Sequence, residues 1–259
     1  MINLMGIGLR GTKSITLQQL EVLKNSDIIY FDVYTSISPE NTILSLEKLL
    51  SKKIVIADRE TIENSEEILQ NAKKFNVTLM VTGDALTATT HNEIREEAMK
   101  NKIETRVYEN ASIFTAFPAR TGLFNYKFGN IVSLPFVHEN FFPLSVYDKI
   151  YRNHANDMHT LLLLDLNNGK TMGLKDAIQT LLKMEDKRGK GLITGKTPII
   201  IGIRVGMDHE RIIFTDIKKI VNGMAQDLLD ESPISIIIPA GLNDKELEFI
   251  KIFCENELV

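Results

Sequence analysis

The chain begins with a glycine pattern that could hold a phosphate group. The stretch GIGLRG at 6–11 follows an apolar run, and Asp32 lies about 20 positions beyond it. In a dinucleotide-binding turn, such glycines let the backbone approach the pyrophosphate, and the acidic residue binds a ribose hydroxyl. The first chemistry that the sequence suggests is therefore that of a nicotinamide enzyme.

The position of the following helix argues against that interpretation. A dinucleotide turn needs a helix that begins inside the glycine motif, because its free N–H groups hold the pyrophosphate. Here the apolar helical spacing starts only at Ile15, and the predicted cap is Ser14 or Thr16. Thr16 has Gln19 three residues later, which predicts a capping box. Gly11 should then lie in a loop ahead of the helix.

The first two glycines still favour a ligand site. Gly6 and Gly8 follow a predicted strand, and without a Cβ they allow a sharp turn or a close approach to a ligand. A small ligand could rest against Leu9, which comes next.

A second segment with possible chemistry is TGDALTATTH at 82–91. A predicted strand ends there in Gly83-Asp84, where a carboxylate can accept hydrogen bonds from a ribose or an amine. Helix capping explains at least one of the following threonines. His91 falls on the first helical turn, where a packed or surface histidine is expected more often than a base.

A third segment, YENASIFTAF at 108–117, places Ala111-Ser112 between a strand and a helix, so three strand ends should converge on one cleft. The other usual sites have no pattern here. The five histidines lack ligand-like spacing with one another or with the single cysteine, so no metal site is predicted. The sequence also lacks a G-x-S-x-G elbow and a Walker lysine.

The elements that must position these residues are read from hydrophobic periodicity. In the first half, short apolar runs alternate with helical patterns, which predicts an α/β domain with a mostly parallel sheet and flanking helices. In the second half, two strands separated by RVGMDHERIIF predict a hairpin and a mixed sheet with helices. We predict an N-terminal α/β domain at 1–114 and a C-terminal α/β domain at 115–259. The predicted strands are 2–8, 28–32, 54–57, 78–82, 105–108, 131–136, 160–166, 199–205, 212–214 and 234–239, and the predicted helices are 16–24, 41–50, 65–75, 92–101, 147–156, 174–184, 216–222 and 244–257.

Composition sets the broad class. The 259 residues are 44% hydrophobic, which is enough for buried cores. No apolar run approaches the length of a membrane span, and the N-terminus lacks a basic leader, so a cytoplasmic protein is expected. The single cysteine, Cys254, agrees with a reducing compartment and is expected to pack as a small apolar residue. A net charge of -4 argues against a broad nucleic-acid-binding face.

Taken together, the segments resemble the diphthine synthase family in order and spacing from end to end. The resemblance rests on MGIGLRGTKSITLQQLEVLKNSDIIYFDVYTS, ADRETIE, TGDALTATTHNEIREEA, ENASIFTAF, TGLFNYKFG and MHTLLLLDL. The ATTH, YTS and NASI motifs are specific to that family, whereas the opening glycine turn and the GD strand end are shared with the wider tetrapyrrole methylase superfamily.

The resemblance implies a two-domain tetrapyrrole methylase-like fold that binds S-adenosylmethionine in the cleft between the domains and releases S-adenosylhomocysteine. It implies methylation of the amino group of the modified histidine of translation elongation factor 2, which forms diphthine in diphthamide biosynthesis. It further implies a homodimer. Neither the number of methyl groups transferred, nor an archaeal or eukaryotic source, nor the dimer interface follows from the sequence.

The resemblance also carries over cofactor contacts, position by position. From the first domain they are Leu9, Asp84, Thr87, Ser112 and Ile113, and from the second domain Leu164, Val205 and Ile234. The chain departs from the family pattern in three places: Ala85 replaces the usual proline, Thr87 replaces valine or glycine, and Ile234 stands where relatives often carry histidine. If the contacts are made by backbone and van der Waals surface, these changes are tolerable.

No catalytic side chain is predicted, because a sulfonium is already activated and methyl transfer needs mainly alignment and exclusion of water. If a base exists, the candidates are His91, His159 and Asp165. Arg120, Tyr126 and Lys127 could face the protein substrate or form a solvated linker. The alternatives left open are a methylase of a tetrapyrrole or other small molecule, a nicotinamide oxidoreductase, and a non-enzymatic partner of the translation factor.

Overall fold

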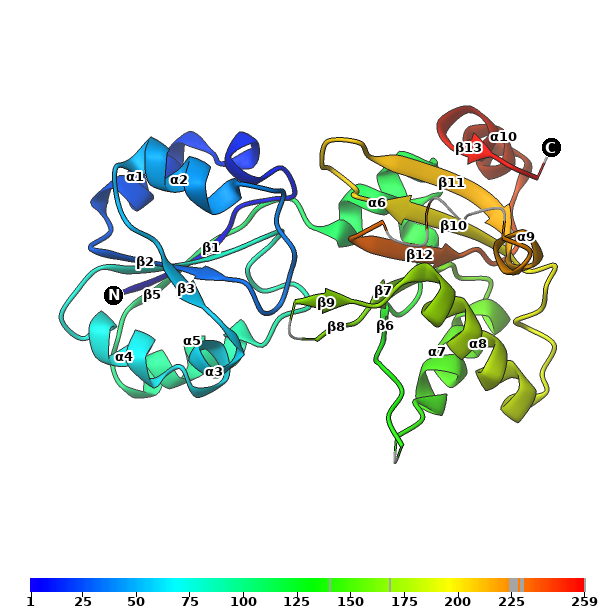
Figure 1. Ribbon diagram of the computed structural model, residues 1–259, viewed down its shortest axis with the longest axis horizontal. Helices are drawn as coiled ribbons and strands as arrows, with labels where there is room; N and C mark the ends of the chain where they lie inside the picture. The colour runs from blue at the N-terminus through cyan, green and yellow to red at the C-terminus, as the bar shows by residue number, and fades with distance from the viewer. Residues whose placement is uncertain (140, 168, 224–227, 229–230, 259) are drawn as a thin grey trace. The chain divides into compact units, whose positions relative to one another are not determined.

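The computed structural model describes residues 1–139, 141–167, 169–223, 228 and 231–258. The chain forms two compact units (Figure 1). The first comprises Met1–Ile113 with the short segments Asn167–Gly169 and Gly206–Asp208, and the second comprises the rest from Phe114 onward. Within the described residues, no helix is both long enough and apolar enough to cross a membrane.

The first unit is built on a parallel sheet of five strands in the order β3-β2-β4-β1-β5. Helices α1 and α2 cover one face, and α3, α4 and α5 cover the other (Figure 1). Neighbouring strand residues point to opposite faces, so Leu4 and Leu79 join one apolar core while Met5 and Met80 join the other. The elements are β1 (Ile2–Gly6), α1 (Leu17–Asn25), β2 (Ile28–Asp32), α2 (Thr42–Leu50), β3 (Val55–Ala57), α3 (Arg59–Asn64), α4 (Glu66–Ala72), β4 (Val77–Val81), α5 (His91–Lys100) and β5 (Thr105–Tyr108).

The second unit has a mixed sheet of six strands in the order β13-β11-β10-β12-β7-β6. β10 and β11 form the predicted antiparallel hairpin, and β6 and β7 are parallel. The elements are α6 (Ile113–Thr121), β6 (Val132–Leu134), α7 (Leu144–Ala155), β7 (Thr160–Leu164), β8 (Leu166–Asn167), β9 (Lys170–Thr171), α8 (Leu174–Arg188), β10 (Pro198–Ile203), β11 (Arg211–Asp216), α9 (Ile217–Val221), β12 (Ile234–Ile238), α10 (Asp244–Phe253) and β13 (Glu255–Asn256).

The predicted α/β class, the parallel sheet and the mixed sheet are confirmed, one helix was missed, and two predicted elements had wrong bounds. Helix α3 was missed because it has six residues and buries only Ile62, too few for a visible period. The last helix ends at Phe253 rather than at 257, because Cys254 is extended and Glu255 pairs with Ile213 of β11. The predicted strand 160–166 is interrupted at Asp165, whose carboxylate accepts the amide of Leu166 at 2.9 Å.

Candidate functional site

The glycine turn after β1 is joined directly to the end of β4. Gly8 and Gly83 exchange two backbone hydrogen bonds, each of 2.9 Å. A Cβ at Gly6 would lie 2.5 Å from the carbonyl oxygen of Gly83, and one at Gly8 would lie 2.7 Å from Asn110 Oδ1. The glycines are therefore required because two strand ends and a third loop approach one another closely.

The side chain of Gln19 stabilises this turn through hydrogen bonds. The predicted capping box is confirmed: Gln19 N donates to Thr16 Oγ1 at 3.2 Å and Gln19 Oε1 accepts from Thr16 N at 3.0 Å, so the helix begins after the glycine motif. Gln19 Nε2 also donates to the carbonyl oxygens of Gly6 and Glu109, at 2.8 and 3.2 Å. Asn110 Nδ2 completes the network by donating to Gln19 Oε1 at 3.1 Å. The sequence marked Gln19 as a cap only, and it placed Asn110 in the NASI motif without giving it a role.

Asp84 organises the loop that follows β4. Its Oδ1 accepts the amide of Leu86 at 3.1 Å and the hydroxyl of Thr87 at 2.8 Å. Its Oδ2 accepts the amide of Asn110 at 3.3 Å. The carboxylate thus ties the β4 loop to the β5 loop, in addition to the ligand role predicted for it.

The five predicted site residues of the first unit follow β1, β4 and β5, so they lie at the carboxyl edge of one parallel sheet. Gly83 stands among them with φ +83°. A Cβ built there would have only Leu9 Cδ2, at 3.8 Å, and the Ala111 carbonyl oxygen, at 4.0 Å, within contact distance. A side chain at this position would be in ordinary van der Waals contact with the Leu9 side chain and the Ala111 carbonyl oxygen. The three strand ends lie side by side, as predicted, and the cleft expected between them stays a prediction.

The three predicted residues of the second unit also share one edge of their sheet. Ile203 of β10 pairs with Ile234, and Leu163 pairs with Ser235, which brings Leu164 beside the start of β12. Val205 follows β10 and packs against Gly202, where a Cβ would lie 2.8 Å from Val205 Cγ2. Val205 and Ile234 are buried and Leu164 is half-buried, so of the three side chains that of Leu164 keeps the most exposed surface.

The candidate bases are held in structural contacts. His91 and His159 have no exposed surface. Asp165 is a turn residue, whose Oδ2 accepts the amide of Phe136 at 2.9 Å. Each of the three side chains is therefore buried or engaged in a hydrogen bond within the protein.

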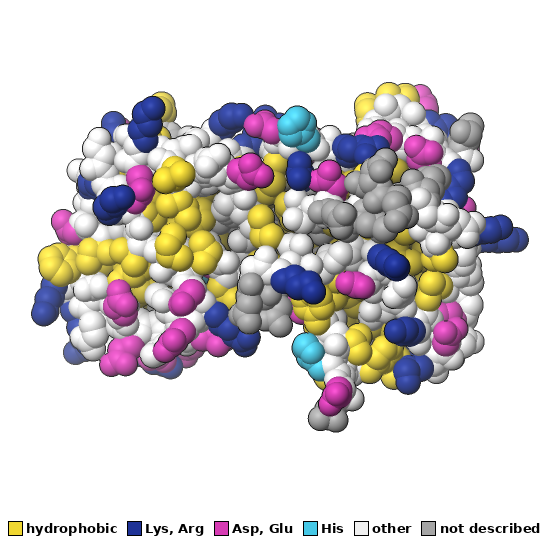
Figure 2. Space-filling model, in the orientation of Figure 1, with side chains coloured by type: hydrophobic (Ala, Val, Ile, Leu, Met, Phe, Trp, Pro, Cys, Tyr) yellow, Lys and Arg dark blue, Asp and Glu magenta, His cyan; other side chains and the backbone are white. Residues whose placement is uncertain are grey.

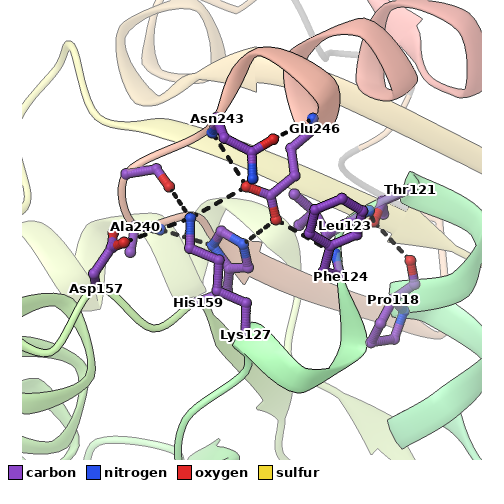
Figure 3. A network of polar contacts seen from close by, with 11 residues as sticks. Pro118, Thr121, Leu123, Phe124, Lys127, Asp157, His159, Ala240, Asn243 and Glu246 are labelled. Carbon is purple, nitrogen blue, oxygen red and sulfur yellow. Dashed lines mark hydrogen bonds and ion pairs between the residues drawn. The ribbon is translucent and has the colours of Figure 1, made fainter.

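His159 belongs to a buried polar network in the second unit (Figure 3). Its Nδ1 accepts the amide of Ala240 at 3.0 Å, so in the neutral ring the proton is on Nε2, which donates to Glu246 Oε1 at 2.9 Å. Burial lowers the pKa of His159 below its usual value and outweighs the attraction of Glu246. Burial would raise the pKa of Glu246, but hydrogen bonds from His159, Asn243, Lys127 and Phe124 bring it below its usual value.

Two of the three residues proposed to face a substrate are engaged within the second unit. Lys127 Nζ lies 3.2 Å from Glu246 Oε2 and also donates to the carbonyl oxygen of Gly241 (Figure 3). Arg120 Nε lies 2.6 Å from Glu210 Oε2. Tyr126 is 81% exposed and stacks on Phe124, so it is the residue of this group with an open surface.

Cys254 is buried at the end of α10, and burial raises the pKa of its thiol to about 12. The expected packing role is thereby confirmed, because a thiol that is not ionised is a poor nucleophile. Among the described residues, no group of three or more His, Cys, Asp or Glu side chains could hold a metal ion. On the face shown in Figure 2, acidic and basic side chains are interspersed, without a continuous basic field.

A cavity of about 830 Å³ lies in the first unit, at the ends of β2 and β3. Its lining includes Tyr34, Asp58, Arg59 and Glu63. None of the eight predicted cofactor residues lines it. Tyr34 and Arg59 both contact Glu63 Oε1, at 3.0 and 2.9 Å, so its wall is itself a hydrogen-bonded cluster.

Comparison with known proteins shows to which family the chain belongs. The sequence profile of the family described as Tetrapyrrole (Corrin/Porphyrin) Methylases matches residues 1–221. A diphthine synthase of Thermoplasma acidophilum is 40% identical over 99% of this chain and 96% of its own length. The chain belongs to the diphthine synthase family. It is accordingly a methyltransferase of the tetrapyrrole methylase superfamily.

Further diphthine synthases agree along the whole chain. The diphthine synthase of Methanococcus aeolicus is 35% identical over 99% of both chains. A solved diphthine synthase structure superimposes with a TM-score of 0.85 at 26% identity, covering 99% of this chain and 97% of the other. The family membership predicted from the motifs is confirmed. The chain therefore does not belong to a family of nicotinamide oxidoreductases.

Proposed function

We propose that this methyltransferase uses S-adenosylmethionine to methylate the amino group of the modified histidine of translation elongation factor 2, forming diphthine. The observation that carries the proposal is the 40% identity to a diphthine synthase across 99% of the chain. The motifs that set this family apart from other tetrapyrrole methylases, YTS, ATTH and NASI, are all present.

The proposed cofactor contacts are the eight residues predicted from the family, in both units. The local structure supports a ligand beside the glycine turn, because Gly83 has no side chain and the atoms nearest to its Cβ position are Leu9 Cδ2, at 3.8 Å, and the Ala111 carbonyl oxygen, at 4.0 Å. A carbonyl acceptor next to apolar surface suits an adenosine group, whose amino group donates hydrogen bonds. In the part of the chain that the structure describes, no group of three or more His, Cys, Asp or Glu side chains could hold a metal ion. The proposed methyl transfer does not need one.

The cofactor, when bound, supplies a methyl group on a positively charged sulfur. The task left for this chain is to hold donor and acceptor in line and to exclude water. Asp84 keeps the β4 loop in shape through Leu86 and Thr87 and fixes the β5 loop through Asn110. The acceptor amine must be neutral to attack, and an apolar surrounding lowers the pKa of an amine, which reduces the need for a dedicated base.

Two measurements test the proposal. Calorimetric titration should detect binding of S-adenosylmethionine and none of NAD. Mass spectrometry should then show that elongation factor 2 carrying the unmethylated precursor gains whole methyl increments when it is incubated with the protein and the methyl donor. An unchanged mass with demonstrated cofactor binding would overturn the assigned substrate. The size of the gain would give the number of methyl groups.

A second candidate is methylation of a tetrapyrrole or other small molecule, which the description of the matching family favours. It predicts cofactor turnover with such an acceptor and none with the elongation factor. Release of S-adenosylhomocysteine in parallel assays with both acceptors separates the two candidates.

We further propose that the protein is a homodimer and acts in the cytoplasm. The family resemblance supports the homodimer, and the single cysteine agrees with a reducing compartment. Sedimentation equilibrium gives the oligomeric state, and a mass of one chain across the concentration range would rule out the dimer.

A further inference from the structure

His91 connects three motifs that lie apart in the sequence of the first unit. It ends the ATTH motif, and its side chain has no exposed surface. Its two ring nitrogens face the loop after β4 on one side and the loop after β2 on the other. Both loops start at the carboxyl edge of the sheet, where the proposed cofactor contacts Asp84 and Thr87 also lie.

The Nδ1 side of His91 holds the β4 loop. Nδ1 lies 2.8 Å from the carbonyl oxygen of Ala85, between Asp84 and Thr87 in the chain. A carbonyl oxygen can only accept, so Nδ1 carries the hydrogen. Thr89 Oγ1 donates to the same oxygen at 2.8 Å. The Ala85 peptide group is thus fixed by two donors from the ATTH segment.

The Nε2 side of His91 faces Asp32, which shapes the YTS loop. Nε2 lies 3.0 Å from Asp32 Oδ2, and both side chains are fully buried. Asp32 Oδ1 accepts the amides of Tyr34 at 2.6 Å and Thr35 at 3.0 Å, and Oδ2 accepts the Thr35 hydroxyl. Burial would raise the pKa of Asp32, but His91 and the hydrogen bonds from Thr35 outweigh it and bring the pKa below its usual value. Asp32 is therefore ionised, and because Nδ1 of His91 already carries a hydrogen, the contact with Nε2 is an ion pair when Nε2 carries one too.

A separate bond ties the same two loops together. Ser36 Oγ donates to the carbonyl oxygen of Thr82 at 3.1 Å, immediately before Gly83. The YTS loop is therefore linked to the β4 loop directly before Asp84, and after Asp84 through His91. His91 is enclosed between these loops, with no surface on which an acceptor amine could reach it, so it cannot serve as a base in this arrangement.

We propose that His91 is a positioning residue for cofactor binding. Through Ala85 it fixes the backbone that carries Asp84 and Thr87, and through Asp32 it locks that backbone to the YTS loop. The inference rests on the proposed function, in which Asp84 and Thr87 contact S-adenosylmethionine. It assigns one physical role to the ATTH and YTS motifs together.

Two amide variants separate the two contacts. In H91N the amide nitrogen can take the place of Nδ1 and keep the bond to Ala85, whereas in H91Q it reaches the place of Nε2 and keeps only the contact with Asp32. We expect the Kd for S-adenosylmethionine to rise about tenfold or more in H91Q, which frees the peptide between Asp84 and Thr87, and to rise less, by about threefold, in H91N, which loses only the link to the YTS loop. Since His91 does not touch the reacting atoms, kcat should change less than the KM for the cofactor in both variants.

The control is H154Q, because His154 is exposed on α7, and it should match the unsubstituted protein. Urea unfolding of each variant measures stability independently. If H91N and H91Q lose cofactor affinity equally and in proportion to their stability, His91 is a packing residue only and the inference fails. If the unsubstituted protein does not bind S-adenosylmethionine, the proposed function fails instead.

Discussion

At the scale of single residues, the site depends on where a Cβ or a buried charge is tolerated. A Cβ at Gly6 would meet backbone atoms of Gly83, Asp84 and Ala85, which cannot move aside as a flexible side chain could. Glu246 is buried yet satisfied, because His159, Lys127, Asn243 and Phe124 all direct donors toward it. In both places the residue type follows from its immediate neighbours.

Gly6→Ala should destabilise the protein by about 1–3 kcal/mol, because the added methyl group would lie 2.5 Å from a carbonyl oxygen. Urea unfolding monitored by circular dichroism measures the loss. Gly195→Ala is the matched control: its Cβ would lie 3.4 Å from Lys218 Cβ, and we expect a change within about 0.5 kcal/mol. Equal stability of the two variants would show that the turn is not tightly packed.

Glu246→Gln should cost about 2 kcal/mol or more, because it removes the charge opposite Lys127 and replaces one acceptor of the network with a donor. Glu248→Gln on the same helix is the control, since Glu248 is exposed and forms a surface ion pair with Lys245. Thermal unfolding should show a lower Tm for Glu246→Gln and an almost unchanged Tm for Glu248→Gln. A shift of equal size in both would contradict a structural role for the buried network.

At the scale of elements, helix α1 does more than cover the sheet. Its third residue after the cap, Gln19, is 2% exposed and reaches the ends of β1 and β5. The start of one helix therefore sets the spacing between two strand ends at the proposed site.

Gln19→Ala should destabilise the protein by about 1–3 kcal/mol, since it leaves the Gly6 and Glu109 carbonyl groups without this donor. Gln18→Ala, one position earlier and exposed, should change stability by less than about 0.5 kcal/mol. Amide hydrogen exchange of residues 6–9 should speed up in the first variant only. Unchanged exchange there would mean that Gln19 does not support the glycine turn.

At the scale of the whole molecule, buried titratable groups make stability depend on pH. His159 has a folded pKa below its unfolded value near 6.5, so the unfolded chain binds more protons and stability falls as the pH drops below about 6.5. Asp32 and Glu246 also have lowered folded pKa values. Their contribution is complete above their unfolded values, near 4, and is lost as the pH falls through the folded ones.

Unfolding free energy measured from pH 8 to pH 3 should therefore decrease in two steps, the first beginning near 6.5 and the second near 4. The difference between Glu246→Gln and the unsubstituted protein should shrink in the second step, where the original carboxylate becomes protonated. A stability that rises as the pH falls from 7 to 5 would contradict the neutral, buried state of His159.

Much of the fold and part of the site were predictable from the sequence. The period of apolar residues predicted the strand–helix alternation, since burial of a sheet face or a helix face leaves that period in the sequence. The spacing after Gly11 predicted a capping box at Thr16 and thereby a helix that starts too late for a dinucleotide turn. These are local properties, and each depends on residues a few positions apart.

Only the tertiary structure decided how distant segments combine. It placed His91 between Ala85 and Asp32, joined Gln19 to Glu109, enclosed His159 with Glu246, and ended α10 early so that Glu255 could pair with β11. These contacts bridge 6 to 90 positions of sequence, and a buried polar side chain is determined by the partner that satisfies it. The sequence by itself determined the periodicity, the caps and the motifs, because those depend on neighbours along the chain, whereas the partners of the buried histidines depend on neighbours in space.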